Sequence, residues 1–324
     1  MSRAVKGYQY KDCIFEVDGR VATFTQSNPA ARNAGTGKMR EGLINAIQAV
    51  RENDDIRVLV LTGDPEGKTF GGGLNVKRRT ARMESPAEGE EITPREDYTP
   101  GTIMHRMATE DRAAFRGTEV PKNAKNLARA QYQYWTEQAF RGGYFLDYEE
   151  AVLRLPKPVI AMVNGAAVGM HADLALMCDI VIASDQAFLS WSYIHRGMVA
   201  AEGGTFLLPR LCGYNRALEI LYLGERVPAQ QLYDWGIINH VVPHDELKSY
   251  TYNLADKLAT VSPPMGMGMV KYAVQRGFGD FAHNLLMHRH EVVQPSNLIL
   301  SASNDALEGS RAFIEKRKPD YTGT

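Results

Sequence analysis

The sequence is poor in cysteine, lacks long apolar runs and carries almost no net charge, and each absence excludes a class of protein. Its 324 residues include 3 cysteines, and Cys13, Cys178 and Cys212 stand too far apart for a CxxC metal motif or a disulfide framework. No apolar run approaches the roughly 18 residues needed to span a bilayer. A net charge of -1 gives no electrostatic reason to expect nucleic acid or a membrane surface as a partner.

Motifs for several kinds of site are missing as well. No spacing of histidine, cysteine or carboxylate residues predicts a metal ion, and no G-x-S-x-G motif predicts a serine nucleophile. The segment LTGDPEGKTFGGGLNVK resembles a phosphate-binding loop, but only three residues separate Gly63 from Gly67 where that loop has four. The N-terminal residues MSRAVKGYQYKD contain no apolar signal core, so we expect a cytoplasmic protein.

What the chain does contain is an order of strands and helices typical of a layered α/β fold. Residues 13–25 alternate around Asp18-Gly19, which predicts a hairpin with a two-residue turn. A helix with one apolar face is predicted at about 36–53, and a buried strand follows at 57–62. The same order recurs at 158–182 and implies right-handed crossovers.

Two regions depart from this pattern. Residues 80–145 are charged, contain proline and show weak periodicity, which predicts an insertion or lid that either forms a wall of the functional site or decorates the surface. Residues 246–324 are predicted to be mainly helical. We therefore expect a core of residues 1–245, which carries the insertion, and a C-terminal helical region of residues 246–324.

The most informative stretch is residues 157–179, KPVIAMVNGAAVGMHADLALMCD. It predicts a buried strand, a glycine turn and a helix that starts near His171, with Asp173 in its first turn. Backbone N–H groups at a helix N-terminus lack intrahelical partners and can stabilise an oxyanion or enolate. Asp173 is either part of such a site or a surface partner of the helix dipole.

The three consecutive glycines at positions 71–73 form a second unusual feature. Glycine lets a backbone approach another group closely because no Cβ intervenes. The triplet therefore predicts a close approach to a ligand, with a flexible surface loop as the alternative.

Six segments together resemble the crotonase superfamily, also called the enoyl-CoA hydratase/isomerase family. The similarity covers most of the chain outside residues 80–145, and the segments come in the order found in the family. They are SNPAARNAGT, VLVLTG with TFGGGLNVK, KPVIAMVNGAAVGMHADLALMCDIVIAS, GMVAAEGGTFLLPRLCG, LYLGERVPAQQLYDWGIINHVVP and EGSRAFIEKRKPDY. The resemblance implies an α/β fold with a spiral core of ββα repeats, a C-terminal helical trimerisation region and a homotrimer or homohexamer.

The resemblance also implies a binding site for a CoA thioester, with CoA as part of the substrate and no separate cofactor or metal. Two backbone N–H groups would bind the thioester oxygen, and the matching positions in this chain are Leu74 and Met170. Contacts to CoA or the acyl group are expected from a set that clusters at the matching motifs: Arg32, Asn33, Ala34, Gly72, Lys77, Tyr193 and His195.

The catalytic carboxylates depart from the hydratase pattern. Hydratases of the family carry a glutamate where this chain has Asp173, and a second one where it has Ser192 or Tyr193. Glu202 instead stands where dienoyl-CoA isomerases carry an aspartate, and those isomerases also have an aspartate matching Asp173 and a glutamate near Tyr193, so the match to them is partial. Glu202 and Asp173 are therefore the expected acid/base pair, although Glu202 in a helix N-cap remains the alternative. His171 and His195 lie nearby in the sequence as catalytic or structural residues.

These features predict an acyl-CoA enzyme of the hydratase or isomerase type. We expect a bulky or cyclic acyl group, because residues 80–145 fall where the family shapes its acyl pocket. One alternative is a hydrolase that adds water to a ring or C–C bond of an acyl-CoA or diketone. The other is a non-catalytic, crotonase-like interaction protein that binds RNA, against which the near-neutral charge argues.

Overall fold

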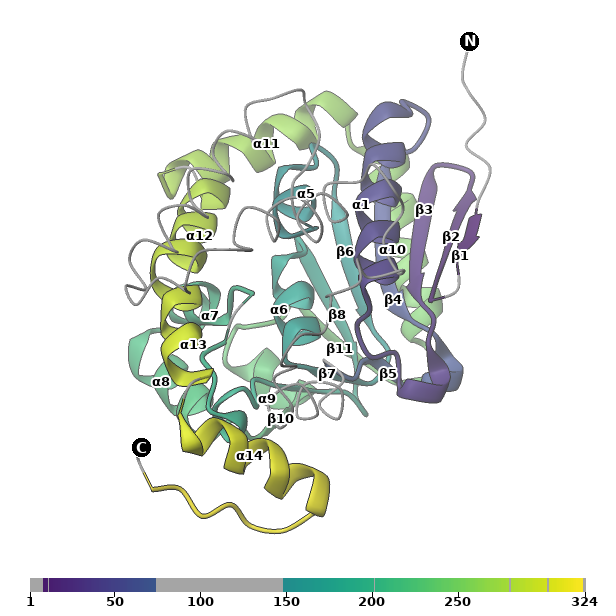
Figure 1. The fold of residues 1–324 in the computed structure, drawn as a ribbon. Helices are drawn as coiled ribbons and strands as arrows, with labels where there is room; N and C mark the ends of the chain where they lie inside the picture. The colour runs from purple at the N-terminus through teal and green to yellow at the C-terminus, as the bar shows by residue number, and fades with distance from the viewer. Residues whose placement is uncertain are drawn as a thin grey trace, which may run out of the picture.

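The computed structural model describes residues 8–10, 12–73, 148–200, 202–279, 281–301 and 303–322. The insertion expected at 80–145 lies outside these residues, as do Leu74 and Lys77. The described parts form two sheets surrounded by helices, which confirms the α/β class (Figure 1).

The larger sheet has seven strands in the order β1-β2-β3-β4-β6-β8-β11. Its strands are β1 (Tyr8–Tyr10), β2 (Cys13–Asp18), β3 (Val21–Gln26), β4 (Val58–Gly63), β6 (Val159–Val163), β8 (Ile180–Ser184) and β11 (His240–Val242). The smaller sheet has the order β10-β9-β7-β5. Its strands are β5 (Thr69–Gly71), β7 (Ala166–Val168), β9 (Phe188–Ser190) and β10 (Arg226–Pro228).

The predicted hairpin is confirmed, with its turn one residue later than expected. Strands β2 and β3 pair antiparallel and Asp18 lies opposite Val21, so the turn consists of Gly19 and Arg20. Gly19 has a φ of 54°, a left-handed conformation that glycine adopts without a steric cost. From β3 to β11 the neighbouring strands run parallel, which agrees with the repeated strand–helix–strand order.

Both faces of the larger sheet are covered, and β4 shows how the sequence achieves this. Leu59 and Leu61 belong to the apolar cluster under α1, α5 and α6, whereas Val58 and Val60 belong to the cluster under α10. Side chains alternate between faces with a period of two, so an unbroken apolar strand is buried on both sides. The helices that cover the sheet are α1 (Gly37–Glu52), α5 (Tyr148–Arg154), α6 (Met170–Met177) and α10 (Leu247–Val261).

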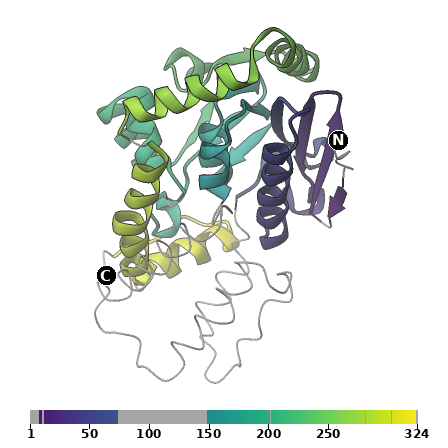
Figure 2. The same cartoon turned by 90° about the horizontal axis from the view of Figure 1, so that it is seen from above.

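The C-terminal part is helical, as expected. Figures 1 and 2 show α11 to α13 following one side of the core, with α14 beside the C-terminus. The remaining helices are α7 (Gly204–Cys212), α8 (Tyr214–Leu223), α9 (Ala229–Asp234), α11 (Pro264–Gly277), α12 (Phe281–His288), α13 (Gln294–Ser301) and α14 (Asn304–Glu315). A π-helical segment, η4 (Arg289–Val293), joins α12 to α13. The domain boundary at residue 245 stays a prediction.

Candidate active site

The stretch at residues 157–179 contains a strand and a helix as predicted, but a second short strand lies between them. After β6 the chain forms β7, which pairs with β5 and β9 and ends just before Gly169. Gly169 has a φ of 58° and forms the N-cap of α6, so Met170 is the first helical residue. The Met170 N–H is therefore one of the helix-start donors without an intrahelical acceptor. Every residue of α6 is buried.

The glycine triplet lies against the imidazole of His171. The Gly73 N–H donates to His171 Nδ1 at 3.1 Å, and a Cβ on Gly71 would come within 2.1 Å of His171 Cγ. Burial, followed by the charge of Arg40, lowers the pKa of His171 to about 3, so the ring is neutral at pH 7. The triplet thus makes a close approach, as predicted, but to a side chain of α6. The flexible-loop alternative is wrong for Gly71 and Gly73.

The contact between the glycine triplet and the His171 ring can be tested by substitution. Gly71→Ala should destabilise the protein by about 3 kcal/mol or more, because its methyl group would overlap the His171 ring. Adding His171→Ala removes the overlap, so the double variant should melt at a higher temperature than Gly71→Ala alone, measured by thermal unfolding. Gly277→Ala is the matched control, since a Cβ there meets nothing within 4 Å. Additive losses in the double variant would contradict the contact.

Asp173 is buried and receives hydrogen bonds from two aromatic side chains. Trp191 Nε1–H and the Tyr193 hydroxyl donate to its two oxygens, each at 2.8 Å. Burial raises the pKa of Asp173 to about 7, against the opposing effect of the Tyr193 and Trp191 hydrogen bonds. The alternative of Asp173 on a wet surface is wrong, because the side chain is fully buried. The buried environment instead gives the Asp173 carboxyl a pKa at which it can gain and lose a proton near neutral pH.

Glu202 is held between two arginines. Its Oε1 lies 3.1 Å from Arg40 Nη2, and its Oε2 lies 2.8 Å from Arg289 Nη2. The side chain is only 8% exposed. Gly203, not Glu202, is the N-cap of α7, so the capping alternative is wrong. The two guanidinium groups favour the ionised carboxylate.

The two candidate carboxylates lie in one region of the core. The backbone N–H of Glu202 donates to the Asp173 carboxylate, and a Cβ on Gly204 would come within 2.7 Å of Asp173 Oδ1. A glycine at position 204 is therefore needed for this approach. One carboxylate is paired with cations and the other with neutral donors, an arrangement that can divide acid and base roles.

Comparisons with known proteins identify the family of the chain. The family model described as enoyl-CoA hydratase/isomerase matches residues 124–324. The 1,2-epoxyphenylacetyl-CoA isomerase of Escherichia coli K12 is 30% identical over 96% of this chain and 98% of its own length. The chain belongs to the enoyl-CoA hydratase/isomerase family.

Two further similarities extend over nearly the whole of this family member. The 2,3-dehydroadipyl-CoA hydratase of Escherichia coli K12 is 29% identical over 94% of this chain and 96% of its own length. The crystal structure of an enoyl-CoA hydratase from Mycobacterium avium subsp. paratuberculosis K-10 has a TM-score of 0.68 at 21% identity, over 97% of this chain and 100% of the other, which shows the shared fold. The crotonase resemblance is confirmed, and the chain is an enzyme of this acyl-CoA family.

The structure of this family member assigns other contacts to several predicted site residues. The carboxamide of Asn33 is buried, donates to the carbonyls of Asp64 and Thr69, and accepts from the Asn28 N–H. It therefore braces a loop of the enzyme, and any contact with CoA would come from the backbone. His195 is exposed, and its Nε2 lies 2.7 Å from the Leu223 carbonyl, so this nitrogen bonds to the end of α8.

Tyr193 is the predicted residue whose contact is most informative. It is, with Ser192, one of the two positions where the family resemblance places the second hydratase carboxylate, and its buried hydroxyl donates to Asp173. A bond from that hydroxyl to the acyl group would have to replace the bond to Asp173. In this family member Tyr193 therefore supports the carboxyl of Asp173.

No sequence pattern indicated which residues surround Glu202. Arg40 comes from α1, Glu149 from α5 and Arg289 from η4, and all three are separated from Glu202 by more than fifty residues. In the described part of this hydratase/isomerase family chain, no group of three or more metal-ligating side chains comes together. In the same part, no helix is both long and apolar enough to cross a membrane.

Proposed function

We propose that this enzyme moves a proton along the acyl chain of a CoA thioester, the isomerase reaction of the family. The observation that carries the proposal is the pair of buried carboxylates in unlike surroundings, Glu202 between two arginines and Asp173 among neutral donors. The placement of Glu202 and Asp173, which matches the isomerase positions of the family resemblance, favours isomerisation over hydration.

In this mechanism two backbone amides bind the thioester oxygen. The Met170 N–H at the start of α6 is one donor, and the Leu74 N–H, after the glycine triplet, is the proposed second. The α-carbon loses a proton to Glu202, and the electrons of the broken C–H bond move onto the thioester oxygen as an enolate. When the enolate collapses, a new C–H bond forms at a more distant carbon with a proton from Asp173.

Asp173 is suited to the donor role because of its burial. A pKa of about 7 keeps an appreciable fraction of the carboxyl protonated at neutral pH, whereas an ordinary aspartic acid would be almost fully ionised. Proton exchange between Asp173 and Glu202, directly or through solvent, then resets the pair.

The CoA moiety is proposed to bind along the backbone of Arg32, Asn33 and Ala34, beside Gly72, with Lys77 as a cationic contact. A Cβ on Gly72 would come within 2.7 Å of the Arg32 carbonyl, and the Gly35 N–H donates to the Gly73 carbonyl. These contacts hold the two segments side by side, which supports a shared binding edge. The proposed bulky or cyclic acyl group draws support from the relative named 1,2-epoxyphenylacetyl-CoA isomerase.

A panel of aliphatic, aromatic and alicyclic enoyl-CoA thioesters tests this function. We expect a product of unchanged mass with a shifted absorption spectrum, strongest for a cyclic acyl group. A product that gains water would replace isomerisation by hydration or by ring hydrolysis. Inertness across the panel together with no CoA binding would favour an interaction protein and reject the proposal.

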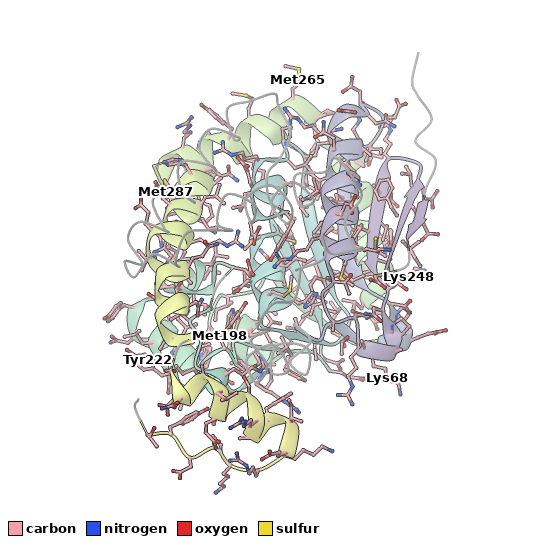
Figure 3. All side chains as sticks on the ribbon, in the orientation of Figure 1. Lys68, Met198, Tyr222, Lys248, Met265 and Met287 are labelled. Carbon is pink, nitrogen blue, oxygen red and sulfur yellow. The ribbon has the colours of Figure 1, made fainter. Side chains whose placement is uncertain are left out.

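We further propose a homotrimer or homohexamer, and helix α11 supplies the argument. None of its residues is buried, and Met265, Met269 and Val270 are 85%, 62% and 64% exposed. Met265 projects from the outer end of α11 (Figure 3). An apolar surface of this kind is typical of a protein interface.

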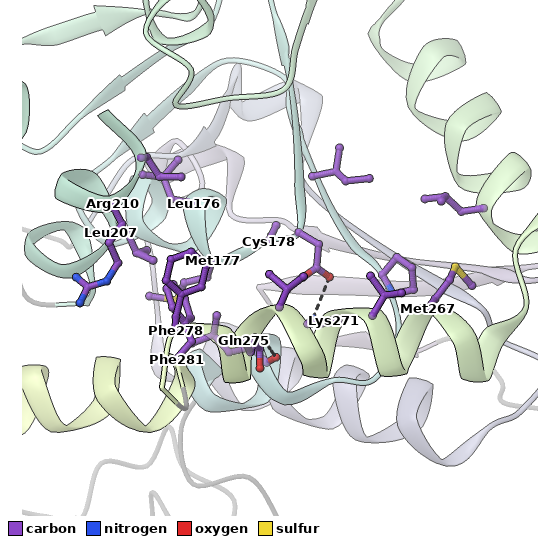
Figure 4. Close-up of a pocket in the computed structure, with 18 of the residues that line it drawn as sticks. Leu176, Met177, Cys178, Leu207, Arg210, Met267, Lys271, Gln275, Phe278 and Phe281 are labelled. Carbon is purple, nitrogen blue, oxygen red and sulfur yellow. Dashed lines mark hydrogen bonds and ion pairs between the residues drawn. The ribbon is translucent and has the colours of Figure 1, made fainter. Parts of the chain in front are cut away.

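The space beneath α11 supports the same proposal. A cavity of about 810 Å³ separates α11 from the ends of α6 and α7, and Figure 4 shows Lys271 and Gln275 on the side of the helix that faces it. Lys271 donates to Asp179 at 2.9 Å and Gln275 to the Leu153 carbonyl at 2.7 Å. Polar contacts thus hold the inner side of the helix, while Met265 and Met269 lie outside the lining of the cavity and remain available to a second copy.

Light scattering on the purified protein measures this assembly. We expect the mass of three or six 36.0 kDa chains, and Met269→Glu should lower it by placing a charge on the exposed face of α11. A monomer at micromolar concentration would reject the proposal. The exposed substitution Lys248→Glu on α10 is the control and should leave the mass unchanged.

A further inference from the structure

A chain of ion pairs runs from the C-terminal helices to the candidate base. Arg289 Nη2 lies 2.8 Å from Glu202 Oε2, and Arg289 Nη1 lies 3.2 Å from Glu149 Oε1. The side chains of these three residues are at most 9% exposed. Arg289 is also the first residue of the π-helical segment η4, and π-helical turns occur frequently at functional sites.

The two ion pairs of Glu202 constrain the orientation of its carboxylate. Each carboxylate oxygen faces a different guanidinium group, Arg40 on one side and Arg289 on the other. The N–H groups of a planar guanidinium point in fixed directions, so Arg289 can pair with Glu202 through Nη2 and with Glu149 through Nη1 at the same time. Glu149 comes from α5, which packs against both α1 and α6. Rotation of the Glu202 carboxylate would therefore break at least one buried ion pair.

Among the described residues, the charges of these ion pairs balance. Arg40 and Arg289 provide two positive charges, and Glu149 and Glu202 provide two negative ones. Other titratable groups face the same region: His171, Asp173, Tyr148 and Tyr193. The pKa of His171 is lowered to about 3, that of Asp173 is raised to about 7, and burial raises the pKa of both tyrosines. Around neutral pH, Asp173 is the group among these four whose charge changes.

We propose that Arg289, braced by Glu149, is a positioning residue that aims the Glu202 carboxylate at the substrate. The C-terminal helical region then supplies part of the catalytic geometry in addition to its proposed role in assembly. This inference rests on the proposed function, in which Glu202 removes the α-proton. It assigns to Arg289 no contact with the substrate.

The double variant Arg289→Gln/Glu149→Gln is the main test, because it removes one charge of each sign and leaves the Arg40–Glu202 pair intact. We expect kcat to fall about 100-fold, a loss typical of a misplaced general base, while KM stays within about twofold. Arg289→Lys should recover about half of the loss on a logarithmic scale, since one ammonium can reach Glu202 but lacks the fork. Arg317→Gln, which removes an exposed C-terminal ion pair with Glu308, is the control and should keep wild-type kcat.

A second comparison separates positioning from general destabilisation. If Arg289 acts through Glu202, adding Arg289→Gln/Glu149→Gln to Glu202→Gln should cause no further loss of kcat. Multiplicative losses would overturn the inference, as would wild-type kcat in a folded double variant or a loss confined to KM. Thermal unfolding of each variant confirms that the assayed protein is folded.

Hydrogen–deuterium exchange at the α-carbon of an acyl-CoA tests the role of Arg289 independently of the proposed isomerisation. A saturated acyl-CoA in D₂O loses its α-proton and gains a deuteron each time an enolate forms and collapses, and NMR detects this without any net reaction. Exchange by the wild type without turnover on the enoyl panel would reject isomerisation, yet the exchange rates of the variants would still test Arg289. If the wild type shows neither α-carbon exchange nor turnover on the enoyl panel, the proposed function fails. The positioning role then has a separate structural test: an unchanged orientation of the Glu202 carboxylate in a crystal structure of the double variant would overturn it.

Discussion

Glu202→Gln is expected to lower turnover of the preferred acyl-CoA about 1000-fold, with thioester binding changed by only a few-fold. The amide keeps a hydrogen-bonding oxygen for one arginine but cannot accept the α-proton. Steady-state kinetics on the substrate found with the thioester panel gives kcat, and isothermal calorimetry with a non-reacting acyl-CoA gives the affinity.

Two companion variants distinguish the loss of a catalytic base from the loss of folding. Glu202→Asp keeps the charge between Arg40 and Arg289 and shortens the side chain, so it should fold and retain a measurable part of the rate. Glu308→Gln removes an exposed carboxylate paired with Arg317 and should leave the rate unchanged. Wild-type turnover in Glu202→Gln would exclude Glu202 as the base.

Asp173→Asn is expected to reduce turnover at pH 7 about 100-fold and to change how stability depends on pH. The rate falls because an amide cannot donate and regain a proton in this range. The folded protein favours the protonated carboxyl, since burial raises the pKa of Asp173 from 3.8 to about 7. The wild type therefore keeps this stabilisation below about pH 4 and loses it as the pH rises to about 7, by up to about 4 kcal/mol.

Urea unfolding at several pH values measures the second effect. The free energy of unfolding of Asp173→Asn, relative to the wild type, should increase between about pH 4 and pH 7. Asp55→Asn, at an exposed turn, is the control and should run parallel to the wild type. A constant difference between Asp173→Asn and the wild type across this range would show that Asp173 ionises in the folded protein as it does in the unfolded chain.

The fold was predictable where a local pattern decides it. The β2–β3 hairpin, α1 and the buried strand β4 were all evident from periodicity and from turn residues. Strand β7 was not, because Ala166–Val168 is a three-residue segment between glycines and looks like a turn. Its strand character comes from its neighbours β5 and β9, which belong to distant parts of the sequence.

The candidate site shows the same division between local and distant information. Asp173 and the helix start at Met170 could be placed from sequence because both depend on one strand–turn–helix segment. The partners of Glu202 could not, since Arg40 precedes it by 162 residues and no helical pattern tells which buried cation meets which carboxylate. The raised pKa of Asp173 was equally inaccessible, because it follows from burial by side chains that only the folded protein brings together.

The smaller sheet, which contains β5 and β7, also bears on which parts of this enzyme can change during evolution. Strands β5 and β7 pair in parallel, and the chain leaves them side by side at Gly72 and Gly169. Hydrogen bonds within the sheet set the distance between the ends of β5 and β7, and the length of the chain that connects the two strands does not. The sequence between residues 74 and 147 can therefore be lengthened, shortened or exchanged during evolution while the ends of β5 and β7 keep their places beside α6.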